Sequence, residues 1–600
     1  MTHARILCTT ALCALASTAH AQAYDLGTLV LSGSLSPVPA EQTASTVEII
    51  EEDALSVAAD TPLLQTLSRQ PGLSYSSNGG LGTTTNLRVR GLDVRYTAVR
   101  FDGIDMSDPS SAQTSFNFGR LSGTAVSRVE VLKGAQSALY GSEAIGGVIN
   151  LESWKPTRDG ASAEVALEAG SYETFIGSAS TGYKSARGEI GLTFGRTATE
   201  GFSTRPGNDE DDGFWQDEVV ASARYDATEA VEVGFTAFWR DSELDIDRSN
   251  TNPDGQNFTI ERGARVFAEG NNGGPLTALL AFSRYSIERD DPTGFTTFFD
   301  GMRDEAEFKL GYDAGGAITA DFGLTGTVET AETSGFDEED EVNSAAFGEV
   351  RWQMNDAATL SFALRHDDNS DFGGQTTGRL AMTYGIAPDL ILRAVAGTGY
   401  RAPSLFERYS SYGNPDLDPE NSRTAEIGIE KRYGQDTFVK ATLFYTEIDD
   451  RIDYDFGTST YNQVSGTTVS EGLELSGAYA LNDAVTFAGA YTYTNAETDG
   501  VAAQRVPRYD LVLGVEADLS PRLRGSAEVQ RLADIEASEF APADHKVGDY
   551  TLVNLGLSYD VMDDSELYIR VENALDEDYE TAGGYNTSGR AVYVGIKTSF

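Results

Sequence analysis

The amino-acid sequence predicts an all-β transmembrane barrel of 22 antiparallel strands, with a small N-terminal α/β plug domain inside its lumen. Residues 161–600 alternate between apolar and polar or small side chains in segments of about ten, the length that a tilted strand needs to cross a bilayer. Short polar turns separate pairs of these segments. Residues 24–155 lack this pattern and instead combine a helical stretch at 62–69 with short strands and glycine-rich junctions, which indicates a separate domain.

The strands of the predicted barrel show the alternation clearly. In the segment 230–240, Val231, Phe235 and Trp239 share one face, while polar residues and glycine occupy the other. The last strand repeats this pattern from Val592 to Phe600. A soluble sandwich would also alternate, so the loops have to distinguish the two folds.

The turns and loops favour the barrel. Tight turns spaced by roughly 30 to 50 residues are joined by longer, often acidic loops such as 207–217, 289–302 and 332–340, and this asymmetry is typical of membrane barrels. Ten turns enclose nine pairs of strands, and two strands at each end bring the expected number to 22. The turns lie near Ser185, Ala227, Asn272, Gly315, Asp356, Pro388, Gln435, Asn482, Pro521 and Asp564. A barrel this wide leaves a lumen that the N-terminal domain must fill.

Residues 1–21 have the order of a secretory signal peptide, with an apolar stretch before an A-x-A cleavage site at Ala19 and Ala21. Both cysteines of the chain lie in this leader, so the mature chain has neither disulfides nor cysteine metal sites. Its two histidines, His366 and His545, are far apart in sequence, which argues against a zinc site or a catalytic triad. We therefore expect that the chain has no catalytic residues and is not an enzyme.

The composition of the chain excludes some classes of partner and of structure. A net charge of -49 and a pI near 4.3 argue against nucleic acid, whose phosphates require clusters of Lys and Arg. An aromatic content of 10% and the strand pattern argue against disorder. No run of 18 apolar residues follows the leader, so no transmembrane helix is expected.

Several segments resemble the TonB-dependent outer-membrane receptors. In the N-terminal domain these are TPLLQTLSRQPGLSYSSNGG (61–80), LRVRGLDVRYTAVRFDGIDMSD (87–108) and VSRVEVLKGAQSALYGSEAIGGVINLES (126–153). In the barrel they are RHDDNSDFGG (365–374), GYRAPSLFERYSSYGNPDLDPENS (399–422), RIDYDF (451–456), SGTTVSEGLELSGAY (465–479) and ENALDEDYETAGGYNTSGRAVYVGIKTSF (572–600). Together they cover nearly the whole mature chain and are more similar to the cobalamin (vitamin B12) receptors of the family than to its larger siderophore receptors.

The resemblance implies active import of cobalamin or a related corrinoid across the outer membrane of a Gram-negative bacterium. Energy would come from TonB and its inner-membrane energising complex, because the chain has no nucleotide-binding loop. A bilayer with lipopolysaccharide would surround the barrel. The implied division of the chain is a signal peptide at 1–21, a TonB-box segment and linker at 22–45, the plug domain at 46–158 and the barrel at 159–600.

Residues 26–33 (LGTLVLSG) are similar to a TonB box, and Gly27 stands where the family usually has an acidic residue. A short, Pro-free, β-prone segment at a chain terminus can add as a strand to the edge of a partner's sheet. The alternative is an ordinary first strand of the plug. The expected box residues are Thr28, Leu29, Val30, Leu31 and Ser32.

Two plug segments match the family's substrate loops, GLGTTTN (80–86) and DPSSAQTSF (108–116). Their hydroxyl groups and glycines suit a large, amide-decorated ligand, although both also fit ordinary polar loops. The expected contacts are Thr83, Thr84, Thr85, Asn86, Ser110, Ser111 and Ala112.

Two neighbouring acidic loops are similar to the calcium-binding loops of cobalamin receptors, and carboxylate oxygens in flexible loops are the ligands that Ca²⁺ prefers. The alternative is a solvated acidic surface. The ligands that the resemblance implies are Glu210, Asp212, Asp241, Asp245 and Asp254.

The plug is rich in arginine for so acidic a chain, and we expect Arg88, Arg90, Arg95, Arg100 and Arg128 to pair with carboxylates of the barrel wall. Two alternatives to corrinoid import remain. The same mechanism could carry a ferric siderophore or haem, or the protein could bind at the outer membrane without transporting.

Overall fold

The computed structural model describes residues 29–51, 63–249, 255–271, 273–434 and 437–600. The predicted signal peptide, Thr28 of the predicted box and Asp254 of the predicted calcium ligands lie outside these residues. No helix in the described ranges is long and apolar enough to cross a membrane.

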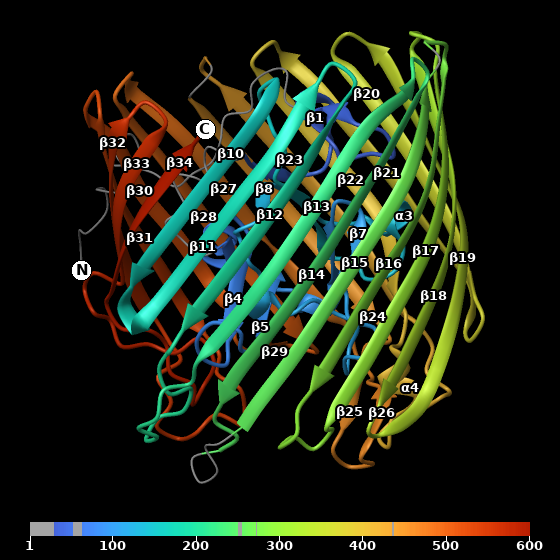
Figure 1. The fold of residues 1–600 in the computed structure, drawn as a ribbon. Helices are drawn as coiled ribbons and strands as arrows, with labels where there is room; N and C mark the ends of the chain where they lie inside the picture. Colours follow the sequence, from blue (N-terminus) through green and yellow to red (C-terminus); the bar gives the residue numbers. More distant parts are fainter. Residues whose placement is uncertain (1–28, 52–62, 250–254, 272, 435–436) are drawn as a thin grey trace, which may run out of the picture.

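Residues 160–599 form a closed antiparallel barrel (Figure 1). Twenty-two long strands and the two-residue β29 make up the described wall, and β10 closes it against β34 through pairs such as Leu167 with Ile596. Closure leaves no strand edge, which is the condition for a sheet inside a bilayer. The fold class and strand number predicted from the sequence are therefore confirmed.

The barrel strands are β10 (Gly160–Gly170), β11 (Thr174–Ser185), β12 (Gly188–Thr199), β13 (Phe214–Thr228), β14 (Val231–Ile246), β15 (Gly255–Asn271), β16 (Leu276–Asp290), β17 (Phe298–Asp313), β18 (Ile318–Thr333), β19 (Phe336–Asn355), β20 (Ala358–Asn369), β21 (Gly373–Ala387), β22 (Leu390–Arg401), β23 (Glu420–Arg432), β24 (Phe438–Asp449), β27 (Thr468–Asn482), β28 (Val485–Thr498), β29 (Val501–Ala502), β30 (Pro507–Ser520), β31 (Leu523–Ile535), β32 (Tyr550–Met562), β33 (Ser565–Glu572) and β34 (Ala591–Ser599).

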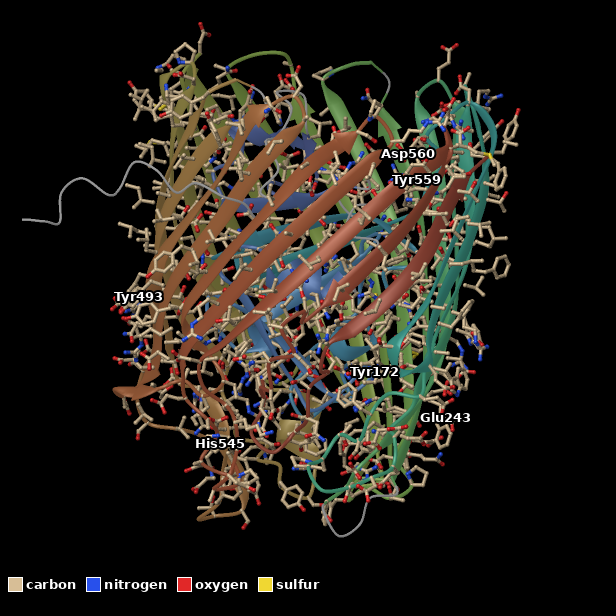
Figure 2. The ribbon with its side chains drawn as sticks, turned by 90° about the vertical axis from the view of Figure 1, so that its left-hand side faces the viewer. Tyr172, Glu243, Tyr493, His545, Tyr559 and Asp560 are labelled. Carbon is tan, nitrogen blue, oxygen red and sulfur yellow. The ribbon has the colours of Figure 1, made fainter. Side chains whose placement is uncertain are left out.

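The alternation of side chains follows the predicted faces. Phe235 and Trp239 of β14 are exposed on the outside of the barrel, as are Leu557 and Tyr559 of β32, because these side chains face lipid rather than the lumen. Inward neighbours such as Arg240 are buried against the plug. Figure 2 shows the outer surface covered by such side chains.

Eight of the ten predicted turns lie between consecutive strands at one end of the barrel, the end that carries the C-terminus at the top of Figure 1. The other two, at Asn272 and Gln435, fall outside the described residues. The other end carries the longer connections, including α4 (Leu405–Tyr409) and the hairpin of β25 (Ile452–Asp455) with β26 (Thr460–Gln463). We take the turn end as periplasmic and the loop end as extracellular. One predicted loop was wrong. Residues 332–340 do not form a long loop, because the acidic residues continue the pairing of β18 with β19 beyond the bilayer. Only a two-residue turn remains between these strands.

The plug lies inside the barrel (Figure 1). Its main sheet has the order β3-β8-β9-β6-β7, and β6 runs parallel to β9. Apolar residues of this sheet and of α2 form one buried cluster with barrel residues such as Phe238 and Tyr285. The plug elements are β1 (Leu29–Val30), β2 (Val38–Pro39), η1 (Ala40–Gln42), β3 (Val47–Ile50), α2 (Leu63–Ser68), β4 (Leu73–Ser77), β5 (Thr85–Val89), η2 (Val94–Tyr96), β6 (Thr97–Phe101), β7 (Ile104–Asp105), η3 (Phe118–Arg120), β8 (Val126–Lys133), α3 (Ser137–Tyr140) and β9 (Gly147–Ser153).

A buried network of charges joins the plug to the wall. The Arg90 guanidinium is 2.7 Å from the Glu426 carboxylate and 2.9 Å from that of Glu474, and Lys133 bridges Glu474 to Glu48 of the plug at 3.1 Å each. All five side chains are almost fully buried. Each charge is compensated, which is what keeps such a cluster stable away from water.

The expectation for the plug arginines holds only in part. Arg90, Arg95 and Arg100 reach carboxylates of the barrel. Arg128 pairs inside the plug instead, with Glu51, Glu130 and Glu152, because β8 and β9 bring those carboxylates beside it. Arg88 has no carboxylate within ion-pair distance among the described residues, and its guanidinium donates to the Ser76 hydroxyl at 2.7 Å.

Candidate substrate site and coupling segment

An open pocket lies between the plug and the wall on the extracellular side. It encloses about 1010 Å³ including solvent, and we call it the upper pocket. The plug supplies α2, the tip of the β4–β5 hairpin and η3, while η4 (Ser171–Glu173), β11, β12, β33, β34 and the loops after β12 and β33 supply the wall. Gly82 at this tip has φ +82°, and a Cβ there would lie 2.2 Å from the Phe214 ring, so the tip packs directly on the wall.

Aromatic rings and small polar groups dominate the lining of the upper pocket. The aromatic side chains come from both bodies, and Tyr172 packs on Phe202 with ring centroids 5.3 Å apart. Hydroxyl groups and glycine backbone fill the spaces between the rings. The aromatic lining residues are Tyr75, Phe118, Tyr172, Phe202, Tyr579 and Tyr593.

The single cation among the described lining residues is already neutralised. Arg570 donates to both carboxylate oxygens of Glu168, at 2.9 and 2.6 Å, and contacts the Glu572 carboxylate as well. Its guanidinium lies 3.6 Å from the centre of the Tyr593 ring. The pocket therefore presents stacking surfaces and neutral hydrogen-bonding groups to a ligand, with no uncommitted positive charge.

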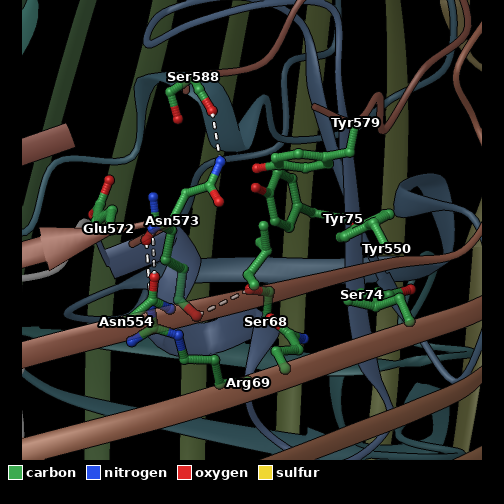
Figure 3. Close-up of a pocket in the computed structure, with 14 residues that line it drawn as sticks. Ser68, Arg69, Ser74, Tyr75, Tyr550, Asn554, Glu572, Asn573, Tyr579 and Ser588 are labelled. Carbon is green, nitrogen blue, oxygen red and sulfur yellow. Dashed lines mark hydrogen bonds between the residues drawn. The ribbon is translucent and has the colours of Figure 1, made fainter. Parts of the chain in front are cut away.

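A second pocket of about 510 Å³ adjoins the first and shares Gln65, Tyr75, Glu572, Tyr579 and Ser588 with it (Figure 3). Its wall strands are β31, β32 and β33.

The side chains at this second pocket connect the plug to the wall. The rings of Tyr550 and Tyr579 lie 4.5 Å apart, and Asn573 accepts and donates hydrogen bonds within the wall loop. Arg69 at the end of α2 pairs with Glu528 of β31 at 2.9 Å.

The predicted substrate residues are divided between two places. Thr85 lines the upper pocket, whereas Thr83 is buried and bonds to Gly80 and Ser77, and Thr84 is exposed at the hairpin tip. Asn86 lies half-buried on the other face of the hairpin.

The second predicted segment lies at a different sector of the wall. Ser110 and Ser111 bond within their own loop, mainly to Asp108. The Ala112 carbonyl accepts a hydrogen bond from Ser404, just before α4. The structure therefore does not bring the two segments to one pocket.

Sequence reasoning missed the wall and loop aromatics. Tyr593 lies on the inward face of β34, but nothing in the strand pattern distinguishes an inward residue that lines a pocket from one that packs on the plug. Phe202 and Tyr579 lie in loops and Tyr172 in the three-residue helix η4, and no periodicity exists in such segments.

The predicted calcium residues are also divided. Asp241 and Asp245 share the outward side of β14 with Trp239, whereas Asp212 is buried in the extracellular loop beside Asp247, which also contacts Glu210. Burial and the neighbouring Asp247 charge raise the pKa of Asp212 to about 6. Within the described ranges no group of three His, Cys, Asp or Glu residues is arranged to hold a metal ion.

The predicted coupling segment rests on the plug near the periplasmic end of the barrel (Figure 1). Leu29 and Val30 form β1, which pairs with β2. The Glu130 carboxylate accepts hydrogen bonds from the backbone N–H groups of Leu31 and Ser32, both at 2.9 Å.

Two further side chains hold the same segment. Arg128 donates to the Leu29 carbonyl at 2.5 Å and pairs with Glu130 at 2.8 Å. The Tyr140 hydroxyl donates to the Ser32 carbonyl at 2.9 Å. Burial raises the pKa of Glu130, a cost that Arg128 and the segment's own donors offset. The polar contacts of the segment are thus made mainly by its main chain, the part that strand addition to a partner would need.

Two family models match the chain. Residues 153–574 match the model described as TonB dependent receptor-like, beta-barrel, and residues 39–148 match the TonB-dependent Receptor Plug Domain. A Vitamin B12 transporter BtuB from Vibrio cholerae serotype O1 is 27% identical, covering 96% of both chains. A protein of the same name from Photobacterium profundum is 26% identical, covering 92% of both.

Solved structures share the fold. The siderophore receptor PirA from Pseudomonas aeruginosa aligns with a TM-score of 0.74 at 20% identity, covering 92% of this chain and 99% of that one. The ferric yersiniabactin uptake receptor FyuA from Yersinia pestis aligns with a TM-score of 0.77 at 18% identity, covering 93% and 98%.

Proposed function

Because the chain belongs to the TonB-dependent receptor family, we propose that it imports cobalamin (vitamin B12) or a related corrinoid with energy delivered by TonB. The closed 22-stranded barrel and the family place it in the outer membrane of a Gram-negative bacterium. The family is one of receptors and transporters rather than enzymes.

The observation that carries the corrinoid proposal is the chemistry of the upper pocket. A corrinoid offers a broad ring system with many neutral amide groups, and such a ligand needs stacking surfaces and neutral hydrogen-bonding partners. The pocket supplies both, and its described cation is committed to Glu168 and Glu572. Full-length relatives that are named as vitamin B12 transporters support the same substrate.

The extracellular loops disfavour the siderophore alternative. Loop 200–213 carries five acidic residues and one arginine, and loop 573–590 carries four acidic residues and one arginine. Ferric catecholate complexes are anionic and would meet like charge on approach, which lowers both the encounter rate and the affinity. A ligand without strong net negative charge meets no such barrier.

Coupling to TonB is proposed to run through residues 29–32. In the structure Glu130, Arg128 and Tyr140 occupy the main-chain groups of this segment. Ligand binding that shifts β8 of the plug away from residues 29–32 would release those groups, and the freed segment would then add as a strand to TonB. Force from the inner membrane would move the plug and open the path along the wall.

Titration of the purified receptor tests the substrate. We expect saturable binding of cyanocobalamin and weaker or no binding of ferric enterobactin or haem. Phe202→Ala should weaken cyanocobalamin binding about tenfold, since an aromatic contact is worth about 1.4 kcal/mol. Phe295→Ala, which removes an exposed ring in another loop, is the matched control and should bind like the wild type. Tighter binding of the ferric complex than of the corrinoid would overturn the corrinoid proposal.

We propose separately that calcium orders the loop around Asp212. The closeness of Asp212 and Asp247 supports this, because a cation would relieve the repulsion between these two carboxylates. A chelator should weaken cyanocobalamin binding, and Asp247→Asn should make binding insensitive to the chelator. Wild-type binding that is unchanged by chelation would exclude the calcium role.

A further inference from the structure

The polar contacts between the plug and the barrel wall are unevenly distributed around the barrel. Among the described residues, every barrel strand from β13 to β28 except β20 makes a hydrogen bond or an ion pair with residues 29–155. These contacts begin with the Ser122 hydroxyl and Glu218 of β13 and end with the Gly72 N–H and Thr492 of β28. The plug is thus tied to the wall over more than half of the circumference.

The rest of the wall holds the plug much more weakly. Within the described ranges, β31, β32, β34, β10, β11 and β12 make a single such contact with the plug, the ion pair of Arg69 with Glu528 at 2.9 Å. The loop after β33 adds the Thr581 hydroxyl, which bonds to the Ser77 backbone. These strands, with β33 among them, follow one another in the closed sheet. We call β31 to β34 and β10 to β12 the weakly bonded sector.

Both pockets lie against the weakly bonded sector. The upper pocket is bordered by β11, β12, β33 and β34, and the second pocket by β31, β32 and β33. The two share five residues, among them Tyr75 of the plug and Tyr579 of the wall loop. A ligand in the upper pocket therefore borders the second pocket directly.

The second pocket continues the chemistry of the upper one. Side-chain amides from both the plug and the wall line it, beside the rings of Tyr550 and Tyr579. A primary amide both donates and accepts, so it can pair with the amide groups of a ligand. An amide-rich ligand would keep hydrogen-bonding partners on moving from one pocket to the other. The amides of the lining are Gln65, Gln530, Asn554 and Asn573.

An ion pair closes the periplasmic side of the second pocket. The Glu528 carboxylate is held by Arg69, directly after α2, and by the Asn554 amide at 3.3 Å; both partners line the pocket in Figure 3. Because β31 starts at the periplasmic turn near Pro521, Glu528 lies closer to the periplasm than Gln530, which lines the pocket.

The wall below this ion pair carries small inward residues. Ser526, Gly556 and Ser558 share the inward face of β31 and β32 with Glu528 and Asn554. All three are only partly buried, so the plug does not fully cover this part of the wall. The pair of Arg69 with Glu528 is therefore the principal described contact between the second pocket and the periplasmic end of the barrel.

We propose that the second pocket is a transit site, through which the imported ligand passes between the plug and strands β31 to β33 on its way to the periplasm. The proposal rests on the proposed function and specifies the route of its bulky, amide-rich ligand. The second pocket encloses about 510 Å³ and the upper pocket about 1010 Å³, so α2 must move away from the wall to admit a ligand that fills the upper pocket.

This movement needs few contacts to break. Arg69 and Glu528 are 15% and 13% exposed, whereas the pairs of Arg90 with Glu426 and Glu474 are almost fully buried. Separating a partly hydrated pair costs less than leaving a deeply buried charge without its partner. The plug can therefore open a route in the weakly bonded sector while the opposite side of the wall still holds it.

A reversible tether across the route tests the proposal. No cysteine follows Cys13 in the sequence, so Arg69→Cys combined with Glu528→Cys can be joined selectively by a short bifunctional thiosulfonate reagent on intact cells. We expect the tether to lower uptake of labelled cyanocobalamin about tenfold or more, because α2 can no longer leave the wall. Binding of cyanocobalamin should be unchanged, and washing with a reducing agent should restore uptake.

The matched control is a tether between Arg100→Cys and Glu305→Cys. This ion pair joins the plug to β17, which lies halfway around the barrel from β31 (Figure 1), and its side chains are similarly buried, at 14% and 13% exposed. Uptake through the control tether should match the wild type. Loss of uptake with both tethers, with the control tether alone or with neither would overturn the route. Wild-type cells that neither bind nor take up cyanocobalamin would instead overturn the proposed function.

Filling the pocket gives a second test without a tether. Leu552 lines the second pocket and not the upper one, so Leu552→Trp should lower uptake about tenfold while binding of cyanocobalamin is unchanged. Leu555→Trp, on the lipid-facing side of the same strand, is the matched control and should take up cyanocobalamin like the wild type. Wild-type uptake by Leu552→Trp would contradict the transit site. Equal loss of binding and uptake would mean that the pocket holds the bound ligand rather than the passing one, and would also overturn the proposal.

Discussion

Substitution of Val30 by proline is expected to reduce corrinoid uptake by cells to the background of cells that lack the receptor, while binding by the purified receptor stays unchanged. Val30 lies in β1 with its side chain buried beside Ile49 and Leu132, and the polar contacts of the segment around it are made mainly by main-chain groups. Proline removes a backbone N–H and fixes φ, so the segment could no longer add as a regular strand to a partner's sheet. The upper pocket lies at the opposite end of the barrel and would be unaffected.

Val30→Ala is the matched control for this effect. It shortens the side chain but retains the N–H group, so uptake should remain close to that of the wild type. Uptake of labelled cyanocobalamin by intact cells, compared with binding to purified protein, separates coupling from recognition. Full uptake by the proline variant would mean that residues 29–32 are an ordinary plug strand, and a loss of binding would mean that the substitution disrupts the plug.

Substitution of Arg90 by methionine is expected to reduce the free energy that holds the plug in the barrel by about 3 to 5 kcal/mol. This is the usual cost of removing one partner from a buried charge network. The change leaves Glu426 without its plug partner and leaves Glu474 with Lys133 alone. Hydrogen–deuterium exchange of the β8 and β9 amides measures the effect. Their exchange should accelerate roughly a hundredfold or more, because local opening then needs less free energy.

Arg196→Met provides the comparison for this prediction. Arg196 pairs with Asp217 on the outside of the barrel, and the two side chains are 53% and 37% exposed. Removing such a pair changes stability by about 1 kcal/mol or less. Equal exchange rates in the Arg90 variant and the wild type would show that the buried network contributes little to holding the plug.

Local sequence pattern predicted the wall well. The turns near Ala227 and Pro521 and the outward face of β14 all lie where the sequence placed them. In a bilayer every strand must cross, pair on both sides and present apolar residues outward, so each segment carries its own signal. The exception, residues 332–340, lies beyond the bilayer, where acidic residues no longer distinguish a loop from an extended strand.

The site was less predictable. Of the expected substrate residues only Thr85 lines the upper pocket, and the rings of Tyr172 and Phe202 were not identified. The resemblance indicated which plug loops face the outside, but a pocket between two bodies depends on how they fit together. Asp247 shows the same limit, since its contact with Asp212 joins two loops separated by β13 and β14.

The sequence by itself determined the barrel, its strand number, the faces of its strands and the presence of a plug. The reason is that each strand of about ten residues must cross the bilayer, so apolar and polar side chains alternate within every such segment. Only the tertiary structure decided which charges meet. Arg90 and Glu474 are 384 residues apart, and nothing local indicates that Arg90 would be paired and Arg88 would not. Those pairings depend on the depth and rotation at which the plug sits in the barrel, and no single segment of the sequence encodes either.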